Sequence, residues 1–256
     1  LRSQGLTQAH QISLAADASF RQYYRIELDN KSWILMDAPP TKENTRNFVT
    51  VAKYLRSIGI NAPQILVEDV KNGFLLIEDF GDQKFSTILK ASNHKQEGNL
   101  YRKALSLLVT LQEKPPPPWL PRYTTEILME EVDLFTDWFW PMAKSSPISA
   151  TARRTYRDAW KSALQATNTQ ENVLVLRDFH VDNLMWMKGR RGLQQIGVLD
   201  FQDALAGPPL YDLVSLLEDV RRDIRRELVH HLKDHYFTLQ KLEAEKFESI
   251  YTTLSA

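Results

Sequence analysis

Residues 173–186 read Val-Leu-Val-Leu-Arg-Asp-Phe-His-Val-Asp-Asn-Leu-Met-Trp, and residues 196–203 read Ile-Gly-Val-Leu-Asp-Phe-Gln-Asp. In each stretch, apolar residues of β-prone type lie next to aspartates. Leu184–Met187 and Gln194–Leu199 have strand character, and the basic, glycine-containing Lys188–Gly192 between them is typical of a hairpin loop. The sequence therefore predicts a β-hairpin with polar side chains at its open end.

This hairpin would bring two oxygen-bearing side chains together. If it folds near Arg191, Asn183 precedes the first strand and Asp200 follows the second, so the two lie about 5 Å apart across the ladder. An amide oxygen and a carboxylate are hard ligands, and Mg²⁺ takes one or two carboxylates and completes its shell with waters and substrate phosphates. The spacing indicates a Mg²⁺ site that serves a nucleotide.

Asp178 is the candidate general base. It lies five residues before Asn183, in a loop that must return to the same end of the hairpin. With a metal neutralising Asp200, Asp178 can stay ionised and accept a proton from an incoming hydroxyl group. A single aspartate in a loop more often caps a turn and binds water. The spacing of Asp178, Asn183 and Asp200 together favours the functional interpretation.

The composition is that of an ordinary globular protein and excludes several classes of function. The chain has 256 residues, 43% of them hydrophobic and 25% charged, which is enough for one large domain or two lobes. Lysine plus arginine equals aspartate plus glutamate at 32 each, so no net field attracts nucleic acid or an anionic membrane. The chain has no cysteine, which excludes disulfides and thiol nucleophiles. No apolar run approaches a membrane span, and no signal peptide is visible. We expect a cytoplasmic protein without nucleic-acid or membrane partners, for which a monomer is possible.

The order of elements predicts an α+β protein of two lobes, residues 1–81 and 82–256. The first lobe is expected to be a small antiparallel sheet with one helix, and the second to be larger, mainly helical and to carry the hairpin. The predicted elements of the first lobe are a hairpin of Tyr23–Leu28 and Trp33–Asp37, a helix of about Lys42–Ile58 capped by Thr41 and ended by Gly59, and a hairpin of Ile65–Val70 and Phe74–Asp79. The helical segments of the second lobe are Tyr101–Leu111, about Thr124–Trp140, Ala150–Ala166 and Leu213–Phe237.

Two motifs resemble those of a known enzyme family. Arg177–Asn183 resembles the catalytic loop of protein-kinase-like phosphotransferases, and Leu199–Phe201 resembles their metal-binding triplet. His180 within the loop and the run Gly-Pro-Pro-Leu-Tyr-Asp-Leu-Val-Ser-Leu at 207–216 are similar to the aminoglycoside phosphotransferase and choline kinase group. Ala18–Arg25, Leu35–Pro40 and Asp200–Ala204 resemble, more narrowly, the anomeric kinases of N-acetylmuramate and N-acetylglucosamine in bacterial cell-wall recycling.

The resemblance covers residues 15–240 and implies a two-lobed protein-kinase-like fold. It implies ATP and Mg²⁺ as cofactors, and transfer of the γ-phosphoryl group to the C1 hydroxyl of an amino sugar. Carried over to this sequence, Asp178 is the catalytic base, Asn183 and Asp200 are the Mg²⁺ ligands, and the hinge that meets adenine through its backbone is Glu78, Asp79 and Phe80.

This sequence departs from the wider kinase pattern at the strand lysine that grips the phosphates. Met36 or Asp37 occupies that part of the strand, and the glutamate that normally partners the lysine is absent near Phe48. The paired loss is coherent, because a buried glutamate without its lysine would be an uncompensated charge. Another cation must meet the phosphates. We expect Arg21 or Arg25, beside the Ala18-Ser19 turn, to fill this role. The pattern is equally consistent with two exposed strand arginines.

The acceptor site needs hydrogen-bonding groups and an aromatic face for the sugar ring. Glu131 and Trp138 lie on a predicted helix that is rich in both, although core packing is the usual role of a tryptophan. Asp203 follows the metal triplet and can contact the sugar or hold the loop. Asp212 is expected to support the catalytic loop by accepting backbone hydrogen bonds.

Three other functions stay open at this point. The acceptor can be an aminoglycoside or another small alcohol. The chain can be a metal-dependent phosphohydrolase in which Asp178, His180 and Asp182 hold the metal. The missing lysine and glutamate also allow a nucleotide-binding pseudokinase, in which Asp178 would have no catalytic role.

Overall fold

The structure of this chain, a computed structural model, describes residues 5–14, 20–165, 167, 172–242 and 244–255. The Ala18-Ser19 turn expected from the sequence lies outside these residues. Contacts divide the chain into two units, Leu1–Leu107 with Val181–Asp203 (unit 1) and Leu108–His180 with Ala204–Ala256 (unit 2). The hairpin that follows the catalytic loop thus groups with unit 1. The functional division into residues 1–81 and 82–256 stays a prediction.

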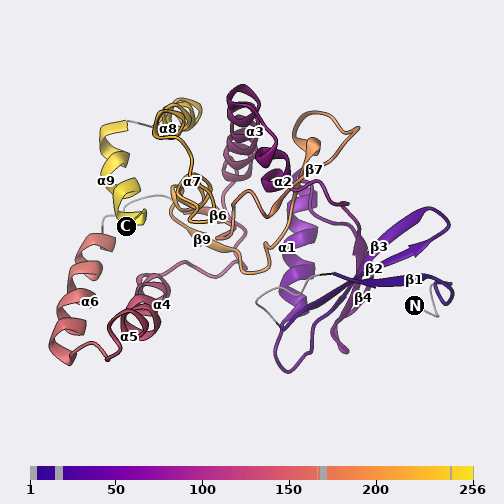
Figure 1. Cartoon of the computed structure of the whole chain (residues 1–256), viewed down its shortest axis with the longest axis horizontal. Helices are drawn as coiled ribbons and strands as arrows, with labels where there is room; N and C mark the ends of the chain where they lie inside the picture. The colour runs from indigo at the N-terminus through magenta and orange to yellow at the C-terminus, as the bar shows by residue number, and fades with distance from the viewer. Residues whose placement is uncertain (1–4, 15–19, 166, 168–171, 243, 256) are drawn as a thin grey trace. The chain divides into compact units, whose positions relative to one another are not determined.

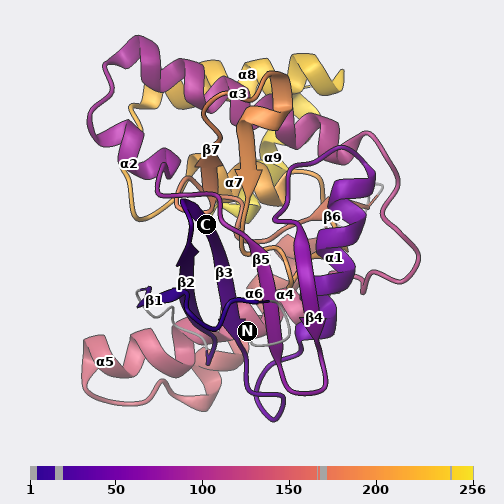
Figure 2. The same ribbon diagram turned by 90° about the vertical axis from the view of Figure 1, so that its right-hand side faces the viewer.

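Unit 1 is built on a five-stranded antiparallel sheet. Its strands are β1 (His10–Ser13), β2 (Gln22–Leu28), β3 (Lys31–Asp37), β5 (Phe74–Glu78) and β4 (Ile65–Asp69), in that spatial order. Figure 2 shows β2, β3, β5 and β4 side by side, with helix α1 (Thr45–Ser57) running along β4. Both predicted hairpins are present. The sequence did not reveal β1, because all four of its residues are exposed and leave no apolar alternation.

The turn between β2 and β3 explains why this hairpin forms. Asp29 and Asn30 have φ angles of 50° and 60°, the left-handed conformations that a two-residue hairpin turn needs. The register pairs Leu28 with Lys31 and Tyr24 with Leu35. It places Ile26 in a cluster with Leu6 and Leu76, so the turn chemistry and the apolar pattern agree on one register.

Helix α1 begins three residues later than predicted. Its N-cap is Asn44, whose side chain accepts a hydrogen bond from the Arg46 backbone at 3.1 Å, whereas Thr41 was expected in this role. Pro39 accepts turn hydrogen bonds from Lys42 and from the following residue, so this segment is a turn rather than helix. The predicted stop is confirmed: Gly59 has φ of 86°, and the Ile60 backbone N–H bonds back to Leu55.

The rest of unit 1 is helices α2 (Phe85–Lys90) and the first part of α3 (His94–Gln112), with the hairpin β7 (Leu184–Trp186) and β8 (Ile196–Val198). A 3₁₀ turn (Gly192–Gln195) leads into β8. The register pairs Leu184 with Val198 and Trp186 with Ile196, so the centre of the hairpin falls at Arg191, as the sequence predicted.

Unit 2 is mainly helical. Its helices are the end of α3, α4 (Thr125–Leu134), the π-helix η2 (Phe135–Phe139), α5 (Trp140–Lys144), α6 (Ala150–Leu164), α7 (Tyr211–Leu217), α8 (Arg226–Gln240) and α9 (Ala244–Leu254). A two-stranded antiparallel sheet joins β6 (Val173–Val175) to β9 (Leu205–Gly207). Its core packs Leu128 and Met129 of α4 against Leu164, Val175 and Leu205. No helix of the described residues is long and apolar enough to cross a membrane.

Two helix predictions in unit 2 have different outcomes. The segment predicted as a helix at 124–140 is helical, but it consists of α4, one π-helical turn and α5, and it runs on to Lys144. The prediction of one helix at 213–237 was wrong, since the helix is interrupted between Glu218 and Arg225. Asp219 accepts the Arg221 backbone N–H with its side chain, a local bond that competes with the helical ladder.

Candidate active site

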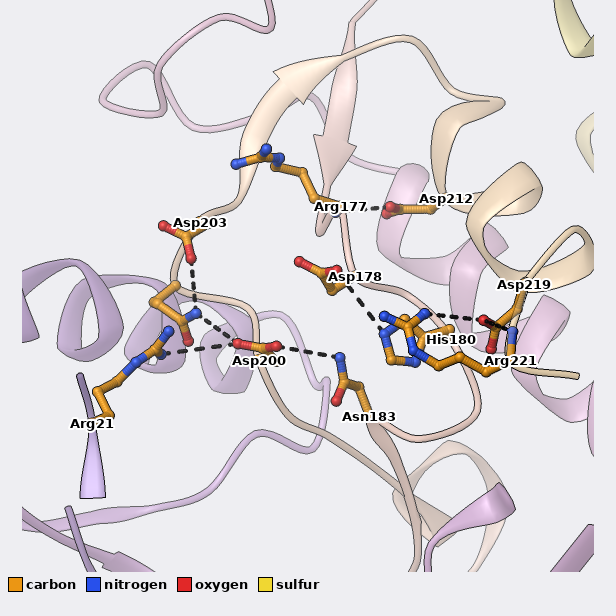
Figure 3. A network of polar contacts seen from close by, with 11 residues as sticks. Arg21, Arg177, Asp178, His180, Asn183, Asp200, Asp203, Asp212, Asp219 and Arg221 are labelled. Atoms are coloured by element: carbon orange, nitrogen blue, oxygen red, sulfur yellow. Dashed lines mark hydrogen bonds and ion pairs between the residues drawn. The ribbon is translucent and has the colours of Figure 1, made fainter. Parts of the chain in front are cut away.

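The open end of the β7–β8 hairpin brings Asn183 and Asp200 together. The Leu199 backbone N–H donates to the Asn183 carbonyl at 2.9 Å, which continues the ladder one pair beyond the strands. The amide Nδ2 of Asn183 lies 3.5 Å from Oδ2 of Asp200 (Figure 3). Asp200 has φ of 57°, which is unusual for a residue other than glycine and typical of a functional position.

This pair fits a magnesium ion. One carboxylate and one amide oxygen leave most of the octahedron to waters and phosphates, as Mg²⁺ prefers, and turning the Asn183 amide over presents its oxygen instead of Nδ2. Asp200 keeps 29% of its side chain exposed and so stays accessible to an ion. Among the described residues no group of three or more His, Cys, Asp or Glu could hold a metal, so the phosphohydrolase alternative, with Asp178, His180 and Asp182 as ligands, gains no support.

Arg21 is the cation next to Asp200. Its Nη1 lies 3.9 Å from Oδ1 of Asp200, and its Nε lies 3.5 Å from Glu43 at the start of α1. Glu43 also accepts the Phe20 backbone N–H at 3.2 Å, so it fixes both the backbone and the guanidinium. Burial alone would lower the pKa of Arg21, but Tyr23 and the surrounding carboxylates raise it above its ordinary value, so the group stays charged.

Arg25 is placed differently. It donates to Asp79 at 2.7 and 3.2 Å and to Asp82 at 2.8 and 3.2 Å. These two carboxylates occupy the guanidinium of Arg25. Of the two arginines expected to meet phosphates, Arg21 is the one that lies next to Asp200, the candidate metal ligand. Where the strand lysine is missing, Met36 is buried and Phe48 of α1 packs against Phe201 with ring centroids 4.9 Å apart.

The three predicted hinge residues use their side chains for structure. Glu78 accepts from Arg190 in the hairpin loop and from the Gln64 backbone at 3.1 Å. Burial tends to raise the pKa of Asp79, but hydrogen bonds from Arg25 and Gly81 hold it below its ordinary value.

Phe80 is buried with Met185 and Met187, so the hinge is fixed to the hairpin. A Cβ at Gly197 would lie 2.5 Å from the Phe80 ring, which shows how closely β8 approaches.

In unit 2, Asp212 supports the loop that carries Asp178. Its carboxylate accepts the backbone N–H of Leu176 at 2.7 Å and of Arg177 at 3.0 Å, which confirms the role predicted for it (Figure 3). Burial raises the pKa of Asp212 to about 7, and the charge of Asp178 adds to this. Arg177 has φ of 71°, so two hydrogen bonds hold a strained backbone just before the candidate base.

Asp178 lines a cavity of about 470 Å³ within unit 2. About half of its side chain is exposed, and Oδ1 lies 4.0 Å from Nε2 of the buried His180. The aromatic part of the lining is Phe135, Tyr156, Trp160 and Tyr211. A base in a cavity with aromatic walls is suited to a hydroxyl-bearing small molecule.

Glu131, predicted for the acceptor site, also lines this cavity. Its carboxylate accepts from Arg177, from the Tyr123 hydroxyl at 2.6 Å and from the Tyr211 hydroxyl at 3.0 Å. Trp138, in contrast, is 74% exposed and is not among the lining residues. It is therefore not brought to this cavity.

Asp203 lies in unit 1. It is exposed and accepts from Gln202, which also donates to Asp200 at 2.7 Å.

Two helices supply much of the cavity lining. Leu128, Glu131, Val132 and Phe135 have helical spacing, as have Tyr156, Trp160 and Leu164, but no local pattern shows that these two faces meet. Arg221 also lines the cavity. Its position depends on the break between α7 and α8, which the helical pattern conceals.

A family model described as the phosphotransferase enzyme family matches residues 10–246. The chain belongs to this family. Two curated relatives named N-acetylmuramate/N-acetylglucosamine kinase match this chain, one from Pseudomonas aeruginosa with 34% identity over 90% of the chain and one from Neisseria meningitidis with 36% identity over 87%. In both cases the chain spans 65% of the relative's own length.

Solved structures similar to this chain confirm its fold. The aminoglycoside phosphotransferase APH(2'')-Ib matches with a TM-score of 0.66 and 12% identity, over 99% of this chain and 87% of that one. The choline kinase LicA from Streptococcus pneumoniae matches with a TM-score of 0.61 and 12% identity, over 99% and 88%. Together with the antiparallel sheet and the helical unit 2, these matches confirm the predicted two-lobed α+β, kinase-like fold.

Proposed function

We propose that this phosphotransferase moves the γ-phosphoryl group of ATP to the anomeric hydroxyl of N-acetylmuramate or N-acetylglucosamine, with Mg²⁺ as cofactor. Its curated relatives carry the names of kinases for these two sugars, at 34–36% identity. Solved structures of the same fold include an ADP-bound form and an ATP ternary complex. Residues 1–81 would bind the nucleotide, and residues 82–256 would supply the base and the acceptor site.

One observation in particular supports the proposal: Asn183, Asp200 and Arg21 lie together in unit 1. An amide, a carboxylate and a buried cation are the groups that a metal-bound triphosphate requires. Asn183 and Asp200 would hold Mg²⁺, which offsets the charge of the phosphates when bound. Arg21 would contact phosphate oxygens, and Glu43 holds its guanidinium in place.

The acceptor chemistry follows from the cavity of unit 2. Asp178 would accept the proton of the sugar hydroxyl as the new P–O bond forms, while the aromatic lining covers the apolar side of the ring. Glu131 is already bonded to Arg177 and two tyrosines, so it shapes the wall and fixes the loop before Asp178. The backbone of Glu78–Phe80 would meet adenine, because the side chains there have structural partners.

The experiment is an acceptor screen with ATP and Mg²⁺. ADP release is measured with N-acetylmuramate, N-acetylglucosamine, kanamycin and choline, and the product is identified by ³¹P NMR as a sugar 1-phosphate. ADP should form only with N-acetylmuramate or N-acetylglucosamine. Turnover with kanamycin or choline alone would replace the proposed acceptor, and release of phosphate from an added phosphate ester in the absence of ATP would point to a phosphohydrolase.

A further inference from the structure

The charged side chains that line the cavity of unit 2 are not equally paired. Among the described residues they are Glu131, Arg177, Asp178 and Arg221, with His180 beside them. Glu131 and Arg177 form an ion pair inside the lining, so their charges cancel there. Arg221 is paired with Asp219, which is not part of the lining. Among the described residues, Arg221 is thus the lining cation that forms no ion pair with a carboxylate of the lining.

Asp219 holds Arg221 in a defined position. The Asp219 side chain is 2% exposed, and its Oδ1 accepts both the backbone N–H and Nη1 of Arg221 at 3.0 Å. Figure 3 shows the Arg221 side chain running from Asp219 toward His180 and Asp178, which line the same cavity. Asp219 therefore holds Arg221 from outside the cavity, through Nη1 of the guanidinium.

The other edge of this guanidinium remains open to a ligand. In the described part of the chain, the contacts of Arg221 engage only Nη1, and 54% of its side chain is exposed. The Nε–Nη2 edge offers two parallel N–H groups, which match the two oxygens of a carboxylate. By contrast, Nε of Arg177 is buried and its guanidinium is bonded to Glu131, so Arg177 is less suited to a ligand.

An acidic acceptor needs such a group. N-acetylmuramate differs from N-acetylglucosamine by a lactyl ether that carries a carboxylate. In the cavity this carboxylate shares a low-dielectric space with the carboxylate of Asp178, and like charges there repel each other. A neutral sugar meets no such repulsion. A cation at the cavity wall is required for the acid alone.

We propose that Arg221 is a specificity-determining residue that binds the carboxylate of an acidic amino sugar in the cavity of unit 2. The proposal rests on the proposed function, since it assigns one side chain to one substituent of the acceptor. It makes Arg221 the reason why the enzyme accepts a charged sugar as well as a neutral one.

The test compares N-acetylmuramate with its lactyl amide, which has nearly the same shape without the charge. The measured quantity is the ratio of kcat/KM for the acid to kcat/KM for the amide. In Arg221→Gln, which lacks the cation, this ratio should be about tenfold to a hundredfold lower than in the wild type. Arg221→Lys, which keeps the charge but loses the paired N–H groups, should give an intermediate ratio. Arg225→Gln is the matched control, since Arg225 is an exposed arginine of the same segment outside the lining.

The outcomes separate this inference from the proposed function. N-acetylglucosamine turnover by the wild type tests the function, and the ratio of acid to amide tests Arg221. If the wild type phosphorylates N-acetylglucosamine but Arg221→Gln and Arg221→Lys both keep the wild-type ratio, the inference is overturned and the function stands. If the wild type phosphorylates no amino sugar, both are overturned. Thermal unfolding of each variant shows whether the fold is lost. Partial unfolding lowers the rates with the acid and with the amide equally, so it leaves the acid-to-amide ratio unchanged.

Discussion

The pair Asn183 and Asp200 in unit 1 and the cavity of unit 2 are assembled in opposite ways. Asn183 and Asp200 are 17 residues apart and are joined by a single hairpin. The cavity takes its lining from Leu128 to Leu254, through four α-helices, the π-helix η2 and loop residues. Charge and turn chemistry decide the first, and packing decides the second. The difference teaches that a motif can fix where the chemistry occurs without fixing what the chemistry acts on.

Asp178→Asn should have the largest effect. The variant keeps the shape of the side chain but cannot accept a proton, so kcat should fall by about 10²- to 10⁴-fold. The KM for ATP should stay within about twofold, because the proposed nucleotide groups lie in unit 1. Steady-state kinetics at saturating sugar measure both values.

Asp182→Asn is the control for this prediction, since Asp182 is a half-buried carboxylate of the same loop to which no role is assigned. Equal rates for wild type and Asp178→Asn would show that the chain is a pseudokinase. The proposed division of roles between the two units would then be lost.

Asp212 tests whether the support of the catalytic loop depends on buried charge. Its pKa is about 7 in the folded state and near 3.8 when exposed, so the folded state holds a proton that the unfolded state has lost. The contribution of Asp212 to the unfolding free energy is therefore largest below about pH 4. It decreases as the pH rises to about 7, by as much as ~4 kcal/mol.

Urea unfolding of wild type and Asp212→Asn between pH 4 and pH 8 measures this effect. Asparagine imitates the protonated acid and does not titrate. The difference in unfolding free energy between the two proteins should therefore shift in favour of the variant as the pH rises. A constant difference would mean that Asp212 is ionised throughout.

Arg21, which comes just before β2, and Arg25, which lies within β2, form a matched pair of arginines. Arg25→Met removes the partner of Asp79, whose side chain is 4% exposed, and should lower the unfolding free energy by about 3 kcal/mol. Arg21→Met should change stability by only about 1 kcal/mol but raise the KM for ATP by about tenfold, because it removes a charge-assisted contact to phosphate.

Thermal unfolding and ATP kinetics on both variants give this comparison. The reverse result, with ATP affinity lost in Arg25→Met and kept in Arg21→Met, would exchange their roles.

Gly197→Ala disturbs Phe80 in unit 1 and leaves the cavity of unit 2 unchanged. The added methyl would lie 2.5 Å from the Phe80 ring, so the ring must move, at a cost of about 1–3 kcal/mol. Because Phe80 belongs to the proposed hinge, the KM for ATP should rise while the KM for the sugar stays unchanged. Gly189→Ala in the same hairpin is the comparison for backbone strain alone: its φ of 85° strains an alanine, but nothing lies within 4 Å of a Cβ there, so the KM for ATP should stay unchanged. An unchanged KM for ATP in Gly197→Ala would separate Phe80 from nucleotide binding.

Much of this molecule could be predicted from local signals. The hairpin centre at Arg191 and the stop at Gly59 follow from turn chemistry, and α1 follows from its apolar period. Predictions failed where local signals compete. The N-cap is Asn44 rather than Thr41, and Asp219 interrupts a pattern that otherwise reads as one helix.

The candidate site shows the same limit. Glu131 could be placed near an acceptor because its segment is rich in hydrogen-bonding and aromatic groups, but Trp138 in the same segment is 74% exposed and does not line the cavity. The π-helical turn Phe135–Phe139 changes which side chains of this segment face the cavity, and the helical period of the sequence does not reveal such a turn.

The sequence by itself determined the family, the hairpin and the identity of Asp178, Asn183 and Asp200, because these depend on residue types at short spacing. Only the tertiary structure decided that Arg21 rather than Arg25 is next to Asp200, and that Arg221 belongs to the cavity of Asp178. The physical reason is that ion pairing and cavity walls depend on which distant side chains share a surface. Packing of the whole unit sets that arrangement, and no local pattern records it.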